Sequence, residues 1–584
     1  MHDMTIRQYC DRRLSGLRLE REDWFNHWKE LADYIMPRRG RFLLSERNKG
    51  NKINTKIIDN TGTIAARTLA SGMMSGITSP ARPWFRLTTA DPGLANFEPV
   101  KEWLYSVETV MRRVFATSNI YNCLHTTYYD LGVFGTSGII IDEDREDMLR
   151  GYPLTTGEFF YAVNDRLEVE TMYREYSMTV WQCVSMFGLE NVSPTVRSMY
   201  DRGNYDQWVE VIHALERNPD AKPMGKYGAR MGEDAFYAKQ RVRSAQKAFR
   251  SCYYEKGANT QQMLRCSGYD EFPLLAPRWD VTSTDAYGRS PGMDALGDVK
   301  QLQHMEKKAA QAVDKMVTPP LQGPSSMKNT PTSGLPGGMN YVDAAQPNGG
   351  LRPVFEVNPR LAEFNVKEGE CRNRINSAFF ADLFLMMAQT DRKEITAREV
   401  QERHEEKMLA LGPVLERLQN ELLDPLIDRT FEVLVKHSKP GWDGLDSRMV
   451  IPPPPKELVN MDIKVDYVSI LAQAQKAIAT GGIERLSGFV GNLAGVNPQV
   501  LDKIDFDRAV DEYGDALGIS PKIIRGDEEV KKIRDERNKA MAQQQQAAQM
   551  QQVASTAVQG AEVMSKTDTG SKNLLTDILG MRAA

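Results

Sequence analysis

The chain has 584 residues, too many for one hydrophobic core, so the sequence predicts several domains. Its hydrophobic content of 41% and charged content of 26% are typical of a soluble globular protein. With 74 basic and 78 acidic residues the net charge is −4, which excludes a chain that is basic throughout and binds nucleic acid over its whole surface. Any contact with DNA must therefore be local.

The six cysteines include no CxxC pair, which indicates free, mostly buried thiols in a reduced cytosolic protein and not a disulfide framework. The seven histidines lack an HExxH pattern and the spacing to cysteine that zinc sites show, so we predict no metal and no cofactor. The N-terminus has no apolar signal core, and no run of about 18 apolar residues occurs. A membrane span is not expected.

Amphipathic helices dominate the N-terminal part of the chain. The second of them is rich in glycine and alanine, so another helix can approach it closely, and its glycines do not match a phosphate-binding loop. Arg38, Arg39 and Arg41 follow the first helix, where a solvated loop is favoured over a phosphate site. The predicted helices cover residues 4–36, 59–78, 101–116 and 119–132.

A β-rich section follows, from Gly135 to about residue 283. Thr179 and Gln182 form a capping box that begins a short helix inside it. The acidic run 142–144 favours a solvated turn over a cation site, and His213 favours a packed or exposed residue over a ligand. The predicted strands are 138–141, 159–163, 167–172, 208–213 and 249–254, and residues 219–248 are expected to form a mobile loop.

Two long helices of similar length are predicted at residues 291–317 and 359–387. Each begins with an N-cap residue followed by proline, and each carries apolar residues at helical spacing over roughly 40 Å. Between them, residues 318–358 are rich in proline and glycine and hold only four charged residues, with short strands expected at 339–342 and 351–357. Such a small apolar unit cannot bury itself within one chain, which suggests an oligomer.

Beyond the second helix, a short charged loop leads to a capping box at Thr396 and Glu399 and a long helix to about residue 437. Pro413 and Pro425 are expected to kink this helix. A strand at 462–467 and a run of helices follow. The glutamine-rich end of the chain is predicted to be disordered, or helical only when a partner is present.

No local pattern marks a catalytic site. The chain lacks a Walker A motif, a GxSxG elbow and the kinase signature, so we predict no catalytic residues and no enzyme. Two alternatives stay open: a scaffolding or structural assembly protein without a DNA channel, and, more remotely, a multidomain enzyme with catalytic residues far apart in the sequence. A ring with an open axial channel would argue against the scaffolding alternative. A monomer with a deep polar pocket would favour the enzyme alternative.

The order of these elements resembles the portal (head-to-tail connector) proteins of short-tailed bacteriophages. The segments that carry the resemblance are 56–61, 79–85, 287–292, 394–400 and 422–426, and the likeness covers about residues 4–540. It implies an α+β, mainly α subunit of a ring, usually a dodecamer, at one capsid vertex. The implied parts are a wing (1–285), a first stem helix (286–317), a clip (318–358), a second stem helix (359–387), a channel loop (388–395), a wing helix and linker (396–459), a crown (460–540) and a low-complexity tail (541–584).

The resemblance also implies partners and site residues. The ring would conduct double-stranded DNA without reading its sequence and would bind the terminase packaging ATPase, the major capsid protein, and the tail adaptor and tail proteins, in the virion and, during assembly, in the host cytoplasm. Arg392 and Lys393, with Gln389 as a weaker contact, are expected to face DNA; the alternative is that both cations are simply solvated. Further candidates are Lys367, Arg372 and Arg374 on the channel or between subunits, and Met339, Tyr341 and Phe355 on the clip docking surface.

Overall fold

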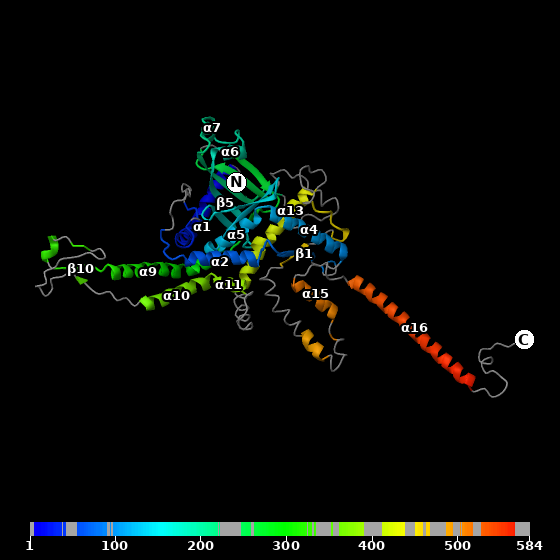
Figure 1. The fold of residues 1–584 in the computed structure, drawn as a ribbon. Helices are drawn as coiled ribbons and strands as arrows, with labels where there is room; N and C mark the ends of the chain where they lie inside the picture. Colours follow the sequence, from blue (N-terminus) through cyan, green and yellow to red (C-terminus); the bar gives the residue numbers. More distant parts are fainter. Residues whose placement is uncertain are drawn as a thin grey trace.

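In the computed structural model, helix α5 (Ile120–Phe134) lies at the centre of the body and is buried on almost all sides (Figure 1). Four helices contact it: α1 (Ile6–Tyr34), α2 (Thr61–Gly76), α4 (Glu98–Thr117) and α9 (Pro291–Val317). These are the N-terminal helices expected from the sequence, together with the first of the two long helices. Their shared core includes Trp28, which also donates a hydrogen bond from its indole N–H to the carbonyl of Phe134 over 3.0 Å.

The structure describes part of the chain. It comprises residues 5–37, 39–42, 55–89, 91, 94, 97–219, 221, 247–258, 262–323, 325–329, 332–333, 352–353, 361–389, 411–438, 450–458, 463–467, 486–493, 503, 505–517 and 527–566. Most of residues 219–248, expected to form a mobile loop, lies outside it.

Two antiparallel sheets form the β-rich section. The larger has the order β4-β5-β6-β7-β8 and the smaller the order β3-β2-β9. The larger sheet consists of β4 (Phe159–Val163), β5 (Val169–Thr179), β6 (Trp208–Arg217), β7 (Phe249–Glu255) and β8 (Arg265–Tyr269). The smaller sheet consists of β2 (Ile139–Asp144), β3 (Met148–Pro153) and the two-residue β9 (Leu274–Leu275).

The five predicted strands are confirmed, with shifted boundaries. Strand β2 continues to Asp144, so the acidic run 142–144 lies in a strand and the expectation of a solvated turn is wrong; β5 continues to Thr179 and β6 to Arg217. Strand β5 begins at Val169 and not at Leu167, because Leu167 adopts a φ of 63° in a tight turn and donates its N–H to the carbonyl of Asn164. The capping box of Thr179 and Gln182 is confirmed at the start of α6 (Val180–Phe187). The sequence analysis missed β3, β8 and helix α7 (Pro194–Asp201).

The strand expected at residues 462–467 pairs with a strand from the N-terminal part of the chain. Strand β12 (Ile463–Tyr467) pairs antiparallel with β1 (Phe85–Thr89), with Phe85 opposite Tyr467. The ring of Trp84 stacks on the ring of Tyr467, with centroids 6.5 Å apart and planes 10° apart. A five-residue strand needs a partner for its backbone groups, and β1, nearly 400 residues away, provides it. The strand expected at 462–467 is thus confirmed, and the boundary of the crown stays a prediction.

The second long helix is interrupted. Residues 361–389 form two helices, α10 (Leu361–Ala378) and α11 (Ala381–Gln389), where the sequence analysis expected one. Phe380 between them has a φ of 54°, which no helical residue adopts. The break lets buried Leu383 and Phe384 reach α2, which contacts α11. Helices α9 and α10 lie side by side and project from the body as a hairpin (Figure 1).

The expected clip is described only in part. Strands β10 (Leu321–Gln322) and β11 (Arg352–Pro353) pair with each other near a 3₁₀ turn at Ser325–Asn329, in agreement with a small β unit. The expected strand at 339–342 lies outside the described residues.

The C-terminal part contains more helix than expected. A π-helical turn at Gln419–Leu423 interrupts the kinked helix between its two prolines and leads into α13 (Asp424–His437). A 3₁₀ turn at Lys456–Leu458 and helix α15 (Phe506–Leu517) follow. Helix α16 (Asp527–Lys566) covers much of the glutamine-rich tail, for which the sequence analysis expected either disorder or a helix formed with a partner. Alanine, glutamine and methionine, which favour helix, outweigh the low complexity of this segment.

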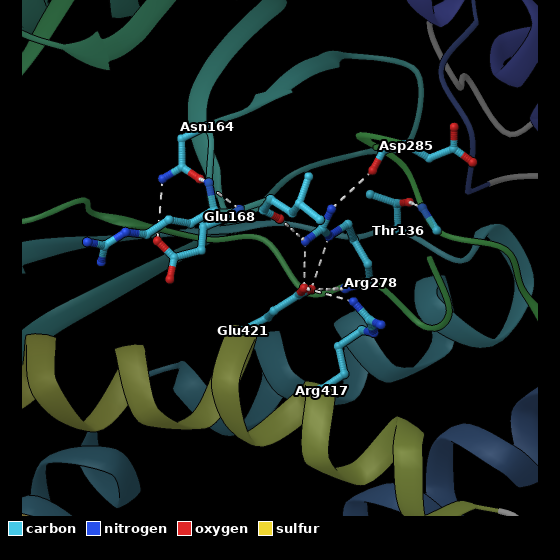
Figure 2. A network of polar contacts seen from close by, with 10 residues as sticks. Thr136, Asn164, Glu168, Arg278, Asp285, Arg417 and Glu421 are labelled. Carbon is cyan, nitrogen blue, oxygen red and sulfur yellow. Dashed lines mark hydrogen bonds and ion pairs between the residues drawn. The ribbon is translucent and has the colours of Figure 1, made fainter. Parts of the chain in front are cut away.

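Arg278 and Glu421 connect the β-rich section to the π-helical turn (Figure 2). Arg278 is 2% exposed, and its backbone N–H, Nε and Nη2 all donate to the carboxylate of Glu421 at 2.6–3.2 Å. The guanidinium also donates to the carbonyls of Asp285 and Leu167, and Arg417 approaches Glu421 to 3.5 Å. Each nitrogen of this buried guanidinium therefore has a hydrogen-bond acceptor.

Replacing Glu421→Gln should lower the free energy of unfolding by about 3–5 kcal/mol, because it leaves the buried Arg278 cation without its counter-ion. Thermal and denaturant unfolding of the purified protein measure this. Glu416→Gln, an exposed position on the same helix, is the matched control and should change stability by less than about 0.5 kcal/mol. Equal effects of the two substitutions would contradict the importance of the ion pair.

Candidate functional site

The base of the hairpin is built by the segment 287–292. Ser290 caps α9: its hydroxyl oxygen accepts from the N–H of Met293 over 3.1 Å, and its O–H donates to the carbonyl of Val133 over 2.6 Å. Pro291 occupies the first turn, where no N–H is needed. A Cβ on Gly292 would lie 2.7 Å from the oxygen of Val133, so only glycine lets α9 start this close to α5.

Tyr287 and Gly288 fix the same segment from the other side. The hydroxyl oxygen of Tyr287 accepts from the N–H of Tyr161 over 3.0 Å, and the two rings stack with centroids 6.0 Å apart. Burial raises the pKa of Tyr287, so its hydroxyl remains protonated. Gly288 donates to the hydroxyl of Thr136 over 2.8 Å. The segment that carried much of the sequence resemblance is thus the junction between body and hairpin.

Gln303, in the middle of α9, holds a second segment against the hairpin. Its Oε1 accepts from the N–H groups of Ile58 and Asp59 over 2.6 and 2.9 Å, and its Nε2 donates to the carbonyl of Asp59 over 2.7 Å. The side chain is 6% exposed. The amide makes three hydrogen bonds to the 55–60 segment that precedes α2, so this segment is tied to the first long helix.

Arg372 and Arg374 form ion pairs within the chain. Arg372 pairs with Asp59 at 3.0 Å and with Glu306, and Arg374 pairs with Asp298 at 2.8 Å. Burial raises the pKa of Asp59, but hydrogen bonds from Thr61 and Arg372 outweigh burial and lower the pKa overall. Both arginines therefore fasten α10 to α9 and to the 55–60 segment. Whether they also meet a channel or a neighbouring subunit stays a prediction.

The other expected site residues fall at the edge of the described chain or beyond it. Lys367 is exposed on α10. Gln389 is the last residue of α11, and Arg392 and Lys393 lie outside the described residues. Met339, Tyr341 and Phe355 also lie outside them. The structure therefore places the helix that leads into the expected channel loop and leaves the roles of these residues as predictions.

Helix α11 is positioned by the small residues of α2. A Cβ on Gly72 would lie 2.2 Å from Cγ of Phe384, so the two helices can approach only because this position is glycine. Gly132 on α5 makes a similar close contact with Leu69, which lies three residues before Gly72 on α2. The expectation that the small residues of 59–78 admit a neighbouring helix is confirmed, and α11 is one such neighbour.

Sequence reasoning missed the roles of Asp59 and Gln303. Asp59 lies in the segment 56–61, which carries part of the resemblance, and no chemical role was predicted for it. The sequence pattern could have singled out Gln303, because this polar side chain borders the apolar face of α9, next to Leu302. A polar residue at such a place is kept where a specific hydrogen-bond partner exists, but its partner 244 residues away could not be read from the sequence.

The residues that could have served as phosphate or metal ligands are bonded to partners within the chain. Arg39 pairs with buried Asp130 at 2.9 Å, and Arg41 pairs with Glu158 at 2.7 Å. His213 is buried, stacks on Tyr253 and shares a 2.9 Å hydrogen bond with Ser251. In the acidic run, Glu143 pairs with Lys436 at 2.7 Å, Asp144 with Arg150 at 3.3 Å.

The part of the chain that the structure describes holds no cluster of three or more histidine, cysteine, aspartate or glutamate side chains arranged to bind a metal ion. None of the helices there combines the length and the apolar character that crossing a membrane requires.

Comparison with known proteins places this geometry in a family. A family model described as "Bacteriophage head to tail connecting protein" matches residues 7–524. The chain belongs to this family. It is 46% identical over 578 residues to the "Probable portal protein" of Bordetella phage BPP-1 and 42% identical over 581 residues to the "Portal protein" of Salmonella phage epsilon15, in each case over 99% of both chains.

Solved structures of gene transfer agent particles are more distant. One, of the neck of an empty particle, has a TM-score of 0.32 and 10% identity, covering 78% of this chain and 92% of that chain. Another, of a native virion, has a TM-score of 0.30 and 11% identity. At TM-scores this low, these structures support no conclusion about the fold or the function of the chain. The family and the two portal relatives confirm the expected portal function, and they do not favour the scaffolding alternative.

Replacing Gly72→Ala should destabilise the head-to-tail connecting protein by about 1–3 kcal/mol, because the added methyl group forces Phe384 and α11 away from α2. Gly16→Ala is the matched control: nothing lies within 4 Å of a Cβ there, and the change should stabilise α1 by up to about 1 kcal/mol. Thermal unfolding of both variants measures the difference. A Gly72→Ala variant as stable as Gly16→Ala would refute the close packing of α2 and α11.

Proposed function

We propose that the chain forms a ring, most simply a dodecamer, at one capsid vertex, and that double-stranded DNA enters and leaves the capsid through its axial channel. The family match over residues 7–524 is the observation that carries this proposal. The hairpin supports it, because α9 and α10 lie side by side and project from the body (Figure 1). Several such hairpins side by side would form the wall of a tube.

In this proposal the channel touches DNA weakly. The chain has a net charge of −4, so DNA contacts come from a few local cations and not from the surface as a whole. Arg392 and Lys393, just beyond α11, would form a thin basic ring that meets the phosphate backbone without reading bases, with Gln389 beside them. A channel through which DNA slides cannot hold many phosphates tightly.

The partners follow from this position in the particle. A separate terminase ATPase supplies the energy for packaging and docks on the unit around residues 318–358, through Met339, Tyr341 and Phe355. Tail adaptor and tail proteins take the same place afterwards, and the major capsid protein surrounds the body. The protein itself catalyses no reaction, and it assembles in the host cytoplasm before it becomes part of the virion.

The oligomeric state tests the proposal directly. Purified protein should form rings with an open axial channel in negative-stain images, and light scattering should give a mass near twelve subunits. A closed assembly without a channel would favour a scaffolding role, and a monomer with a deep polar pocket would favour an enzyme. Either result would overturn the proposal.

Replacing Arg392→Ala together with Lys393→Ala should preserve rings but reduce the DNA content of assembled particles, because the phosphate contacts are lost. The matched control is Lys531→Ala with Lys532→Ala, an adjacent pair of exposed cations on α16. Particle DNA is measured after nuclease treatment. Wild-type DNA content in the Arg392/Lys393 variant would contradict a DNA role for this pair.

A further inference from the structure

Two cysteines face each other across neighbouring strands of the larger sheet. Cys252 on β7 lies directly opposite Cys266 on β8, their Sγ atoms are 2.8 Å apart, and both thiols are free. Residues directly opposite each other in antiparallel strands have Cα atoms about 4.5–5.5 Å apart, within the range of about 4.4–6.8 Å that disulfides need. A bond between the two sulfur atoms would therefore move them together by less than about 1 Å and keep the strands in register.

The two cysteines differ in their access to solvent. Cys252 is 1% exposed and belongs to a core cluster between the sheet and α1, which also contains Cys10 and Leu14. Cys266 is exposed, and its strand β8 is the last strand on one side of the sheet. An oxidant dissolved in water can therefore reach Cys266 first.

One hydrogen bond gives the two thiols different reactivity. The thiol of Cys252 donates to Sγ of Cys266, and this hydrogen bond together with burial raises the pKa of Cys252. The same hydrogen bond, with a smaller contribution from the positive charge of Arg250, outweighs burial and lowers the pKa of the Cys266 thiol to about 7. A thiolate, and not a thiol, attacks disulfide bonds. Near neutral pH, Cys266 is thus the thiol that reacts first.

We propose that Cys252 and Cys266 form a disulfide when the protein meets a small-molecule disulfide, and that this bond links β8 covalently to β7. The Cys266 thiolate attacks one sulfur of the oxidant, a mixed disulfide forms, and one thiolate of the oxidant leaves. Cys252 then loses its proton to solvent and attacks Sγ of Cys266, which expels the second half of the oxidant. Two protein thiols are oxidised, and the oxidant is reduced to two thiols that take up two protons.

The link would act on a strand that connects distant parts of the body. In β8, the guanidinium of Arg265 lies 5.7 Å from the ring centroid of Phe187 on α6, and the ring of Tyr269 lies 5.6 Å from the guanidinium of Arg429 on α13. Strand β8 has only five residues and pairs along one side with β7. Short elements at the edge of a fold open at a lower free energy than its core. A covalent link within β8 would make this opening rarer and preserve both contacts.

The time at which the bond forms follows from the proposed function, on which this part of the inference rests. The cytosol keeps thiols reduced, whereas a particle outside the cell meets an oxidising medium. The pair is then reduced while rings assemble and becomes a disulfide after the particle is released. Each subunit would thus acquire a covalent link that is present only in the finished particle.

Cys10 on α1 is the other thiol close to this pair. It shares the core cluster of Cys252, but it is fully buried, and burial raises the pKa of its thiol to about 12. It lies on a helix, so no strand register aligns it with Cys252 or Cys266. The structure therefore favours the bond between the two strands over a bond to Cys10, and Cys10→Ser is the matched control.

Oxidation of the purified full-length protein tests the bond. After incubation with oxidised glutathione at neutral pH, remaining thiols are alkylated and unreduced peptides are mapped by mass spectrometry. Wild type and Cys10→Ser should both yield linked Cys252 and Cys266, and Cys266→Ser should not. The rate should fall as the pH drops below 7, because fewer Cys266 thiols are ionised. Circular dichroism confirms that each variant folds.

Hydrogen exchange tests the effect of the bond on the sheet. The amide hydrogens of residues 265–269 should exchange at least about tenfold more slowly in oxidised than in reduced wild type, and Cys266→Ser should show no difference. A persistent mixed disulfide on Cys266, a bond to Cys10, or equal exchange in both forms would overturn the inference.

Alkylation before and after release tests the timing. Particles alkylated inside cells should carry both free thiols, and particles alkylated after release should carry the disulfide. A disulfide already present before lysis, or free thiols in released particles, would overturn the timing. Peptide mapping and hydrogen exchange need no ring, so a wild-type protein that forms the disulfide but no ring would defeat the proposed function and leave the bond established.

Discussion

The anchoring of α9 at Ser290 is the constraint on which the rest of the structure depends. A long helix that projects from a folded body acts as a lever, so any freedom at its base becomes a large displacement at its tip. Ser290 joins the cap of α9 to the carbonyl of Val133 at the end of α5, and Gly292 lets the two helices approach without a side chain between them. Since most residues of α5 are buried, the hairpin begins against a helix that is itself held in the core of the body.

A second constraint acts on the chain after it leaves the hairpin. Glu421 lies in the π-helical turn and accepts three hydrogen bonds from buried Arg278 of the β-rich section. Helix α11, which runs into the expected channel loop (388–395), packs against α2, and Glu421, beyond that loop in the sequence, is held by this ion pair.

Charge is arranged locally in this protein. The whole chain has a net charge of −4, and within the hairpin Arg372 pairs with Asp59 and Glu306 while Arg374 pairs with Asp298. These ion pairs hold α9, α10 and the 55–60 segment together as one unit. The family to which the chain belongs supports a portal function for the protein that carries this unit.

The sequence by itself determined the elements whose signals are local. The cap and proline at Ser290 and Pro291 predicted the start of α9, the capping box at Thr179 predicted α6, and the small residues of 59–78 predicted a close helix contact. Only the tertiary structure decided where the second long helix breaks, that β12 joins β1, and which partners Gln303 and Arg278 bind. The reason is physical: caps and periodicity depend on residues within a few positions of each other, whereas a break at Phe380, a strand pair and a buried amide are stabilised by side chains tens to hundreds of residues away.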